Sequence, residues 1–414
     1  MINFEKFTLE NGLKVIVHND PSTDIVAVNL LYNVGSRDEN PEKTGFAHLF
    51  EHLMFEGSLN IPSFDNPLQM VGGENNAFTS NDITNYYINL PKENIETAFW
   101  LESDRMLSLD FSEKKLEIQK NVVIEEYNQR YLNQPYGDVF LLLRPLAYKV
   151  HPYQWPTIGK DISHIRNASL QDVKDFFMHH YAPNNAILSV AGDVKMQEVK
   201  LLAEKWFAPI EKRQVYNRNL PKEPAQSEKR ILEVEHNVPY DAIYKAFHMS
   251  SKLDKDYYTS DLISDLLSNG KSSRLYQNLV KKHKLFSDIN AYITGEIDEG
   301  LFIIAGKLMQ GIKMQEAEKA IHEEIGQIIL GPIDEYEVEK VKNKFESTHQ
   351  FGQLSVLNKA MDLAYQELLG DAERINAEVE KYRNVTIQDI RIVAEKMFKP
   401  GNSSTLYYYS KNNR

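Results

Sequence analysis

An internal repeat limits which folds are open to this chain. The segment from Asn167 to Asn185 recurs between Asn384 and Asn402, at a constant spacing of 217 positions. Five residues are identical in register, namely Asn167, Gln171, Asp172, Pro183 and Asn185 in the first copy and Asn384, Gln388, Asp389, Pro400 and Asn402 in the second. Each copy continues into an apolar segment typical of a strand, 186–191 or 404–409. We therefore expect two domains of similar build in tandem.

The length of the chain and the repeat together predict the fold class. A chain of 414 residues is too long for one ordinary core. We expect an α+β protein, in which each of two homologous α/β domains has a mixed, mostly antiparallel sheet with helices packed on it. The polar segment 212–229, with Pro221 and Pro224, is predicted to link a domain of residues 1–211 to a domain of residues 230–414.

Prolines and glycines predict irregular structure within the first domain. Residues 135–158 contain Pro145, Pro152 and Pro156, which indicates a loop-rich insertion. Residues 72–76, which begin with two glycines, are predicted to form a turn before a pair of strands at 77–80 and 84–90.

The stretch from Thr44 to Gly57 contains the side chains most suggestive of chemistry. Thr44 is expected to cap a helix that stops at Gly57. His48 and His52 are four residues apart, so a helix places both imidazoles on one face, with Glu51 beside them. Two imidazoles and an adjoining carboxylate are the arrangement that a catalytic zinc ion needs.

The alternative is a pair of surface histidines on an amphipathic helix. Against it, the segment 46–55 is apolar on nearly every side, as its residues Phe46, Ala47, Leu49, Phe50, Leu53, Met54 and Phe55 show. Such a helix is expected to be buried. Buried polar groups need partners, so the pattern favours a metal site.

A third metal ligand is expected on another helix, which we predict to run from Ser112 to about Leu132. Its predicted buried stripe consists of Leu116, Gln119, Val122, Val123 and Tyr127. Glu126 falls inside that stripe, and a buried carboxylate needs a cation. Glu125 lies toward the edge and is expected to face solvent.

Composition excludes several classes of protein and site. The chain has no cysteine, so any metal must be held by nitrogen and oxygen ligands. A net charge of −12 without a basic block argues against nucleic-acid binding. No run approaches the ~20 apolar residues of a membrane span. The first residues lack the pattern of a signal peptide, which predicts a cytoplasmic protein, or a periplasmic one if a leader was removed.

The motif His48-Leu-Phe-Glu51-His52 resembles the inverted zinc motif of the pitrilysin or insulinase-like metallopeptidases. Val123-Ile-Glu-Glu126 is similar to the segment with that family's third ligand, which falls on Glu126. The resemblance spans nearly the whole chain and is strongest to the short two-domain branch, which includes mitochondrial processing peptidases. It implies one zinc ion per chain, held by His48, His52 and Glu126.

The resemblance also implies how peptides are cleaved. Glu51 is then the general base that takes a proton from the zinc-activated water and passes it to the leaving amine. Asn76, Ala77 and Phe78 are similar to the edge strand on which family members bind an extended peptide through backbone hydrogen bonds. The alternative for this segment is an ordinary hairpin.

The chain departs from the family pattern in its second domain. Active members have an Arg followed seven residues later by a Tyr, which help to bind substrate, and here Val280 and Ser287 align with the pair. Gln119 replaces a supporting glutamate of many relatives. The resemblance implies a zinc-bearing subunit that needs a homologous partner with the Arg/Tyr pair, or a homodimer with other donors.

Two hypotheses without catalysis remain beside the metalloendopeptidase. One is a structural subunit, like the core subunits of respiratory complexes built on this fold. The other is a zinc-dependent protein that captures peptides without cutting them. The presence of His48, Glu51, His52 and Glu126 together favours the peptidase, because structural members tend to lose the zinc motif.

Overall fold

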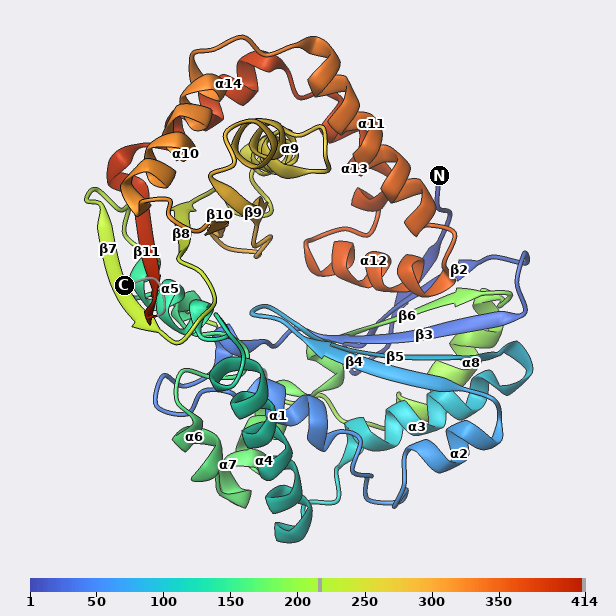
Figure 1. The fold of residues 1–414 in the computed structure, drawn as a ribbon. Coiled ribbons are helices and arrows are strands. Elements are labelled where there is room, and N and C mark those ends of the chain that lie inside the picture. Colours follow the sequence, from blue (N-terminus) through green and yellow to red (C-terminus); the bar gives the residue numbers. More distant parts are fainter. Residues whose placement is uncertain (215–217, 412–414) are drawn as a thin grey trace. The chain divides into compact units, whose positions relative to one another are not determined.

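The computed structural model describes residues 1–214 and 218–411, and its residues group into two compact units (Figure 1). The first unit consists of Met1–Tyr127, Trp155–Leu220 and His349–Ala377. The second consists of Asn128–Gln154, Pro221–Thr348 and Glu378–Arg414. Each unit is thus assembled from three separate chain segments.

The first unit is built on a six-stranded sheet. Its strands lie in the order β1 (Glu5–Thr8), β2 (Lys14–Asn19), β6 (Ala186–Gly192), β3 (Ile25–Tyr32), β5 (Thr84–Pro91) and β4 (Glu74–Thr79). Only the β2–β6 pair is parallel among these strands. β3 and β6 lie in the middle and are almost wholly buried, as their runs of Val, Leu, Ile and Ala require. β4 forms an edge, and its residues alternate between exposed and half-buried.

Helices cover both faces of this sheet. Helix α12 packs on β2, β3 and β6, whereas α3 and α8 lie on the opposite face (Figure 1). The helices of the first unit are α1 (Phe46–Leu53), α2 (Asp65–Met70), α3 (Ile95–Leu107), α4 (Glu113–Tyr127), α6 (Ile162–Arg166), α7 (Leu170–His180), α8 (Met196–Trp206) and α12 (Val356–Leu368).

The second unit repeats this plan with five strands. Their order is β7 (Arg230–His236), β11 (Ser403–Ser410), β8 (Ala242–His248), β10 (Leu301–Leu308) and β9 (Phe286–Ile293). Only the β7–β11 pair is parallel. The helices that lie wholly in this unit are α5 (Val139–Ala147), α9 (Asp256–Ser268), α10 (Met314–Ile329) and α14 (Ile387–Met397). Two more, α11 (Glu335–Gly352) and α13 (Arg374–Arg383), each cross a boundary between the segments.

The two copies of the sequence repeat have the same local structure. Helices α7 and α14 each begin with a capping box, Ser169 with Asp172 and Thr386 with Asp389. Asn185 donates from its Nδ2 to the last carbonyl of α7 at 2.8 Å, and Asn402 does the same for α14 at 2.8 Å. Each copy then enters a central strand, β6 or β11. The expectation of an α+β protein with two similarly built sheets is confirmed.

The two units exchange one helix. Helix α5 follows α4 in the chain but packs on β7, β8 and β11 of the second unit. Helix α12 occurs 217 positions after α5 and packs on the sheet of the first unit. The segments 128–154 and 349–377 are therefore counterparts that have changed places.

The prediction of a loop-rich insertion at 135–158 is wrong for residues Val139–Ala147, which form helix α5. Its sequence is apolar except for Arg144, and it buries Val139, Leu143 and Ala147, at helical spacing, against the sheet. Pro145 lies within the helix, so burial outweighs the loss of one N–H donor. The predicted turn at 72–76 is also too long, because β4 begins at Glu74.

The compact units collect residues that lie close together in space. The predicted domains instead follow the two copies of the sequence repeat, so the units do not test their limits. The domain limits 1–211, 212–229 and 230–414 therefore stay a prediction. Within the predicted linker and second domain, residues 215–217 and 412–414 lie outside the described residues. In the part of the chain that the structure describes, no helix is both long enough and apolar enough to cross a membrane.

Candidate metal centre and active site

Helix α1 begins one residue later than the sequence predicts. Its N-cap is Gly45, with φ of 89°, and the prediction of Thr44 as the cap is wrong. A Cβ on Gly45 would lie 2.7 Å from the carbonyl oxygen of Ile158, so only glycine fits this position. The Thr44 hydroxyl instead accepts from the backbone N–H of Lys160 at 3.0 Å and lies 2.9 Å from His164 Nδ1.

The C-terminal end of α1 also differs from the prediction. The helix ends at Leu53, and the chain makes further turns before Gly57, whose φ is 101°. The expected stop at Gly57 is thus displaced by four residues.

Aromatic packing fixes the orientation of α1. Phe50 is fully buried and stacks on Phe176 and Tyr181, each at 5.0 Å between ring centroids. The Tyr86 hydroxyl donates to the Phe50 carbonyl at 3.3 Å. With its apolar side held in this way, α1 directs His48 and His52 toward α4 and β4, against which it packs.

Helix α4 brings Glu126 to the histidines. Its buried residues are Leu116, Lys120, Val123 and Tyr127, so the predicted stripe is wrong at Val122, which is 42% exposed. The side chain of Glu126 is 17% exposed, while Glu125 faces solvent. Glu126 lies at the edge of the buried stripe rather than inside it, close enough to reach α1.

The three side chains predicted as metal ligands lie together. His48 Nε2 and His52 Nε2 are 3.4 Å apart, and Glu126 Oε2 lies 3.6 Å from the first and 3.5 Å from the second. Zinc bonds of about 2.0–2.1 Å place neighbouring ligands of a tetrahedral site roughly 3.3 Å apart. The donor types and spacing therefore fit a zinc ion. Among the described residues, this is the one group of three or more such side chains that could hold a metal.

Glu51 lies on the same helix, between the two histidines. Burial raises the pKa of Glu51 above its ordinary value, and Glu126 acts in the same direction. Thr79, at the end of β4, and His52 act to lower that pKa. A carboxyl group with a raised pKa accepts a proton more readily near neutral pH, which suits general-base chemistry. The contact with Thr79 was not foreseen, because nothing in the local sequence pairs β4 with α1.

The residues predicted to bind substrate lie on the edge strand β4. Asn76 and Phe78 are exposed, with Phe78 at 41%, and Ala77 is half-buried. Ala77 pairs with Tyr86 of β5 on one side, and β4 is the last strand of the sheet. The backbone edge of β4 is thus placed where an extended peptide could pair with it.

The two positions aligned with the family's Arg/Tyr pair lie in the second unit. Val280 packs against the main hydrophobic core of that unit, and the Ser287 hydroxyl donates to the Lys307 carbonyl at 3.2 Å. Gln119, where many relatives have a glutamate, donates from Nε2 to the carboxylate of Glu56.

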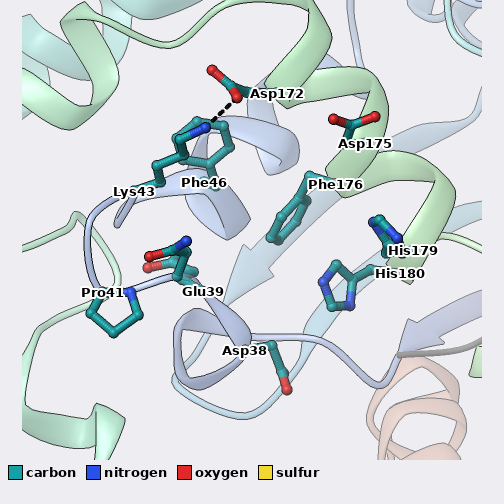
Figure 2. A pocket seen from close by; sticks show the side chains of 11 residues that line it. Asp38, Glu39, Pro41, Lys43, Phe46, Asp172, Asp175, Phe176, His179 and His180 are labelled. Atoms are coloured by element: carbon teal, nitrogen blue, oxygen red, sulfur yellow. Dashed lines mark hydrogen bonds and ion pairs between the residues drawn. The ribbon is translucent and has the colours of Figure 1, made fainter. Parts of the chain in front are cut away.

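A pocket of about 520 Å³ lies beside the N-terminus of α1 (Figure 2). Its lining includes Glu39, Phe46 and His180 but none of the four residues His48, Glu51, His52 and Glu126. The carboxylates along its wall already have partners. Asp172 accepts from Lys43 at 2.5 Å, and Asp38 accepts from Arg218 at 2.6 Å. Its chemistry therefore does not require a cation.

Glu39 binds the start of α1 and was also missed by the sequence analysis. Its side chain is buried and accepts backbone N–H bonds from Gly45 and Ala47. Burial raises the pKa of Glu39 to about 8, although these bonds oppose the rise. An acidic residue shortly before a helix that lacks its own capping side chain is the signal that could have found it.

Comparison with known proteins gives two family matches along the chain. Residues 14–161 match the family described as Insulinase (Peptidase family M16). Residues 167–345 match the Peptidase M16 inactive domain. The first match contains His48, Glu51, His52 and Glu126, and the second contains Val280 and Ser287.

Individual relatives extend the similarity over the full chain. The chain is 31% identical to the zinc protease PqqE of Helicobacter pylori, over 97% of this chain and 92% of that protein. It is 25% identical to a probable mitochondrial-processing peptidase subunit beta of Arabidopsis thaliana, over 71% of this chain and 57% of that one. The crystal structure of a protease from Helicobacter pylori superimposes with a TM-score of 0.92 at 31% identity, covering 99% of this chain and 100% of that one. The chain belongs to the insulinase family of metallopeptidases, peptidase family M16, as a member of its short two-domain branch.

Proposed function

We propose that this chain is the zinc-bearing subunit of an endopeptidase that hydrolyses peptides and unfolded polypeptides. The observation that supports it most is the group of three donor atoms 3.4–3.6 Å apart, with Glu51 on the same helix. Relatives named as zinc proteases support the same chemistry.

In this proposal His48, His52 and Glu126 hold one zinc ion per chain. The ion would supply Lewis-acid activation of a water molecule and of the scissile carbonyl. Two neutral imidazoles and one carboxylate are the ligand set of several catalytic zinc sites. The half-buried position of all three side chains leaves one side open for substrate.

Glu51 moves the proton. Its carboxylate takes a proton from the attacking water and later gives it to the leaving amine. The raised pKa of Glu51 makes the protonated form easier to reach, as the second half of that task requires. Thr79 and His52, which lower the pKa, keep the carboxylate available as a base.

The edge strand β4 holds the peptide. An extended substrate adds to the sheet beside Asn76, Ala77 and Phe78 through its backbone, so that conformation is selected more than sequence. Unfolded segments can adopt this geometry and folded proteins cannot. The end of the strand at Thr79 brings the peptide to Glu51.

Donors for the transition state come from a partner in this proposal. Val280 has no hydrogen-bond donor in its side chain, and the Ser287 hydroxyl is already engaged. The Arabidopsis thaliana relative is named as a probable mitochondrial-processing peptidase subunit beta. A homologous chain that has the Arg/Tyr pair is the expected partner, and a homodimer with other donors is the alternative.

The test combines metal content with cleavage of a quenched peptide, with and without a homologous chain that has the Arg/Tyr pair. Glu51→Gln is expected to keep its zinc and to lose at least about 100-fold in hydrolysis, since general-base catalysis contributes that much or more. Glu125→Gln, which changes an exposed neighbour of Glu126, is the matched control and should cleave normally. A Glu51→Gln protein that cleaves at the wild-type rate would refute the role of Glu51.

The alternative is a subunit that binds peptide or shapes a complex without cleaving. The apolar Val280 in place of an Arg favours it. A zinc-loaded chain that binds unfolded peptides but stays inert with every partner would support capture, and a chain without zinc would support a structural role.

A further inference from the structure

Helix α1 has an N-terminus that its own residues do not cap. Gly45 at the N-cap has no side chain to accept a hydrogen bond. The first backbone N–H groups of a helix have no partner within the helix. Here Gly45 N–H donates to Glu39 Oε2 at 2.9 Å, and Ala47 N–H donates to Glu39 Oε1 at 2.9 Å.

One carboxylate thus takes the place of a capping box, although the helical amide that it binds is that of the second residue, Ala47, and not that of the third. In the usual arrangement, a Ser or Thr at the N-cap bonds to the N–H of the third helical residue, and a Glu or Gln at that third residue bonds back to the N-cap. Neither is available in α1. The N-cap must be glycine because a Cβ would lie 2.7 Å from the Ile158 carbonyl. The third residue is His48, which the proposed zinc site uses.

Because Glu39 is buried, its two hydrogen bonds to the start of α1 are difficult to replace. Its side chain is 5% exposed and lies at the wall of the pocket, close to Phe46, the first residue of α1 (Figure 2). Water cannot easily replace a lost bond at a buried amide, so each unsatisfied N–H destabilises the first helical turn. In its ionised form the carboxylate also lies at the positive end of the helix dipole, which stabilises that form.

We propose that Glu39 is a positioning residue, which fixes the first turn of α1 and thereby the direction in which His48 points toward the metal. The inference rests on the proposed function, since it assumes that His48 binds zinc. Glu39 touches neither the metal nor the substrate. It acts through the backbone at Gly45 and Ala47, on both sides of Phe46 and directly before His48.

The test compares Glu39→Gln with a matched control in the full-length chain. Glutamine keeps one acceptor but presents an NH2 group to the second amide. Glu223 is the control, because its buried carboxylate also accepts backbone N–H bonds, from Lys149, Val150 and His151, within the second unit. Glu223→Gln makes the same chemical change at a similar site remote in sequence from α1.

Two measurements are made on each protein. The first is zinc affinity by competition with a chromophoric chelator, together with the visible spectrum of the Co²⁺-loaded chain. The second is amide hydrogen exchange of the peptide containing α1 in the metal-free protein. For Glu39→Gln we expect zinc binding weaker by about 10- to 100-fold, as for other groups that orient a metal ligand. We also expect an altered Co²⁺ spectrum and faster exchange in α1, with none of these in Glu223→Gln.

Glu39→Asp is shorter by one methylene and reaches one of the two amides, so its values should lie between those of the wild type and Glu39→Gln. It also serves if Glu39→Gln does not fold. Unchanged zinc affinity and exchange in a folded Glu39 variant would overturn the inference, as would an equal loss in Glu223→Gln. A wild-type chain that bound no zinc would refute the proposed function, and the exchange data would still decide whether Glu39 fixes the first turn of α1.

Discussion

Helices α1 and α9 occupy corresponding places in the two units, but only α1 presents ligands that fit a metal. The spacing of 217 positions matches His48 with Asp265, His52 with Asn269, and Glu126 with Asn343. In the second unit Asn269 donates to Asp265 Oδ1 at 2.6 Å, and Lys344 donates to the Asn269 side chain. Arg383 donates to Asn343 Oδ1 at 2.8 Å.

The difference between these two places lies in the side chains and not in the scaffold. In the first unit two imidazoles and a carboxylate face one point, and in the second unit amides and a carboxylate are paired with each other and with cationic neighbours. In both units the helix that follows the corresponding strand, α1 after β3 or α9 after β8, places polar side chains at equivalent positions. Under the proposed function, the identity of about three residues decides whether a metal is held there.

The largest expected effect tests whether bound zinc depends on residues of the first unit alone. His48→Ala should remove bound zinc and lower zinc affinity by more than about 100-fold, since losing a ligand exceeds the loss of a group that only orients one. Asp265→Ala, at the corresponding position of α9, should keep the wild-type zinc content. Elemental analysis of both purified proteins measures this, and equal zinc loss in the two would contradict the assignment.

The exchanged helices predict a second effect, on stability. Leu363 of α12 is fully buried in a core with Ile16, Leu31 and Ile187 of the first unit. Leu363→Ala should lower the free energy of unfolding of that unit by about 3 kcal/mol, because it leaves a cavity. Urea unfolding followed by zinc release would show it. Leu143→Ala in α5 should spare zinc retention and destabilise the second unit by a similar amount, and the reverse pattern would refute the exchange.

A third prediction concerns a contact between sheet and helix that differs between the units. Lys245 on β8 and Glu318 on α10 form a 2.8 Å ion pair, whereas the first unit has the fully buried Val28 and Leu101 at the corresponding positions. Glu318→Gln should cost about 2 kcal/mol, because it leaves Lys245 buried without a counter-charge, and Glu318 keeps some exposure to solvent. The double variant Lys245→Val, Glu318→Leu should recover most of that loss in urea unfolding. No recovery would mean that the two contacts are not equivalent.

The same ion pair predicts how the second unit responds to acid. Burial acts to raise the pKa of Glu318, but bonds from Lys245, Tyr407 and Lys229 outweigh it and lower the pKa from 4.5 to about 2. Because the folded pKa is depressed, the stability that this carboxylate contributes is present above pH 4.5 and is lost as the pH falls toward 2. Unfolding measured across this window should show a smaller pH dependence in Glu318→Gln than in the wild type.

The smallest expected effect is at the second unit's counterpart of the metal site. Lys344 is exposed, so Lys344→Ala should change the free energy of unfolding by less than about 1 kcal/mol. It should also leave zinc content unchanged. A large loss of stability, measured by thermal unfolding, would show that this polar cluster supports its unit in a way that its counterpart does not.

Local patterns in the sequence are enough to predict the features of the fold and of the candidate site that depend on residues close together in the chain. The spacing of His48 and His52 is enough to place both on one helix face, and the repeat around Asn185 and Asn402 is enough to predict similar units. Glu126 was found through a stripe that wrongly included Val122, because α4 buries Lys120 instead. There the long lysine side chain reaches Glu117 and the Ala168 carbonyl, a contact that hydrophobic periodicity does not predict.

Contacts between distant segments could not be predicted in this way. Glu39 reaches α1 from a loop, and Thr79 reaches Glu51 from another strand. Pro145 suggested a loop where burial of Leu143 produces a helix. The exchange of α5 and α12 depends on which sheet each helix covers, and both sheets offer similar apolar faces.

The exchange of α5 and α12 has a consequence for synthesis on the ribosome. The sheet of the first unit is complete once residue 192 has emerged, but Ala27 and Ala191 on it are covered by Val356 and Ala360. At translation rates of about 5–20 residues per second, the chain needs roughly 8 to 30 s to extend from residue 220 to residue 377. Throughout that interval an apolar sheet face stays uncovered on the nascent chain, where it is available to chaperones and to aggregation. The first unit to be started is therefore among the last parts of the protein to be finished.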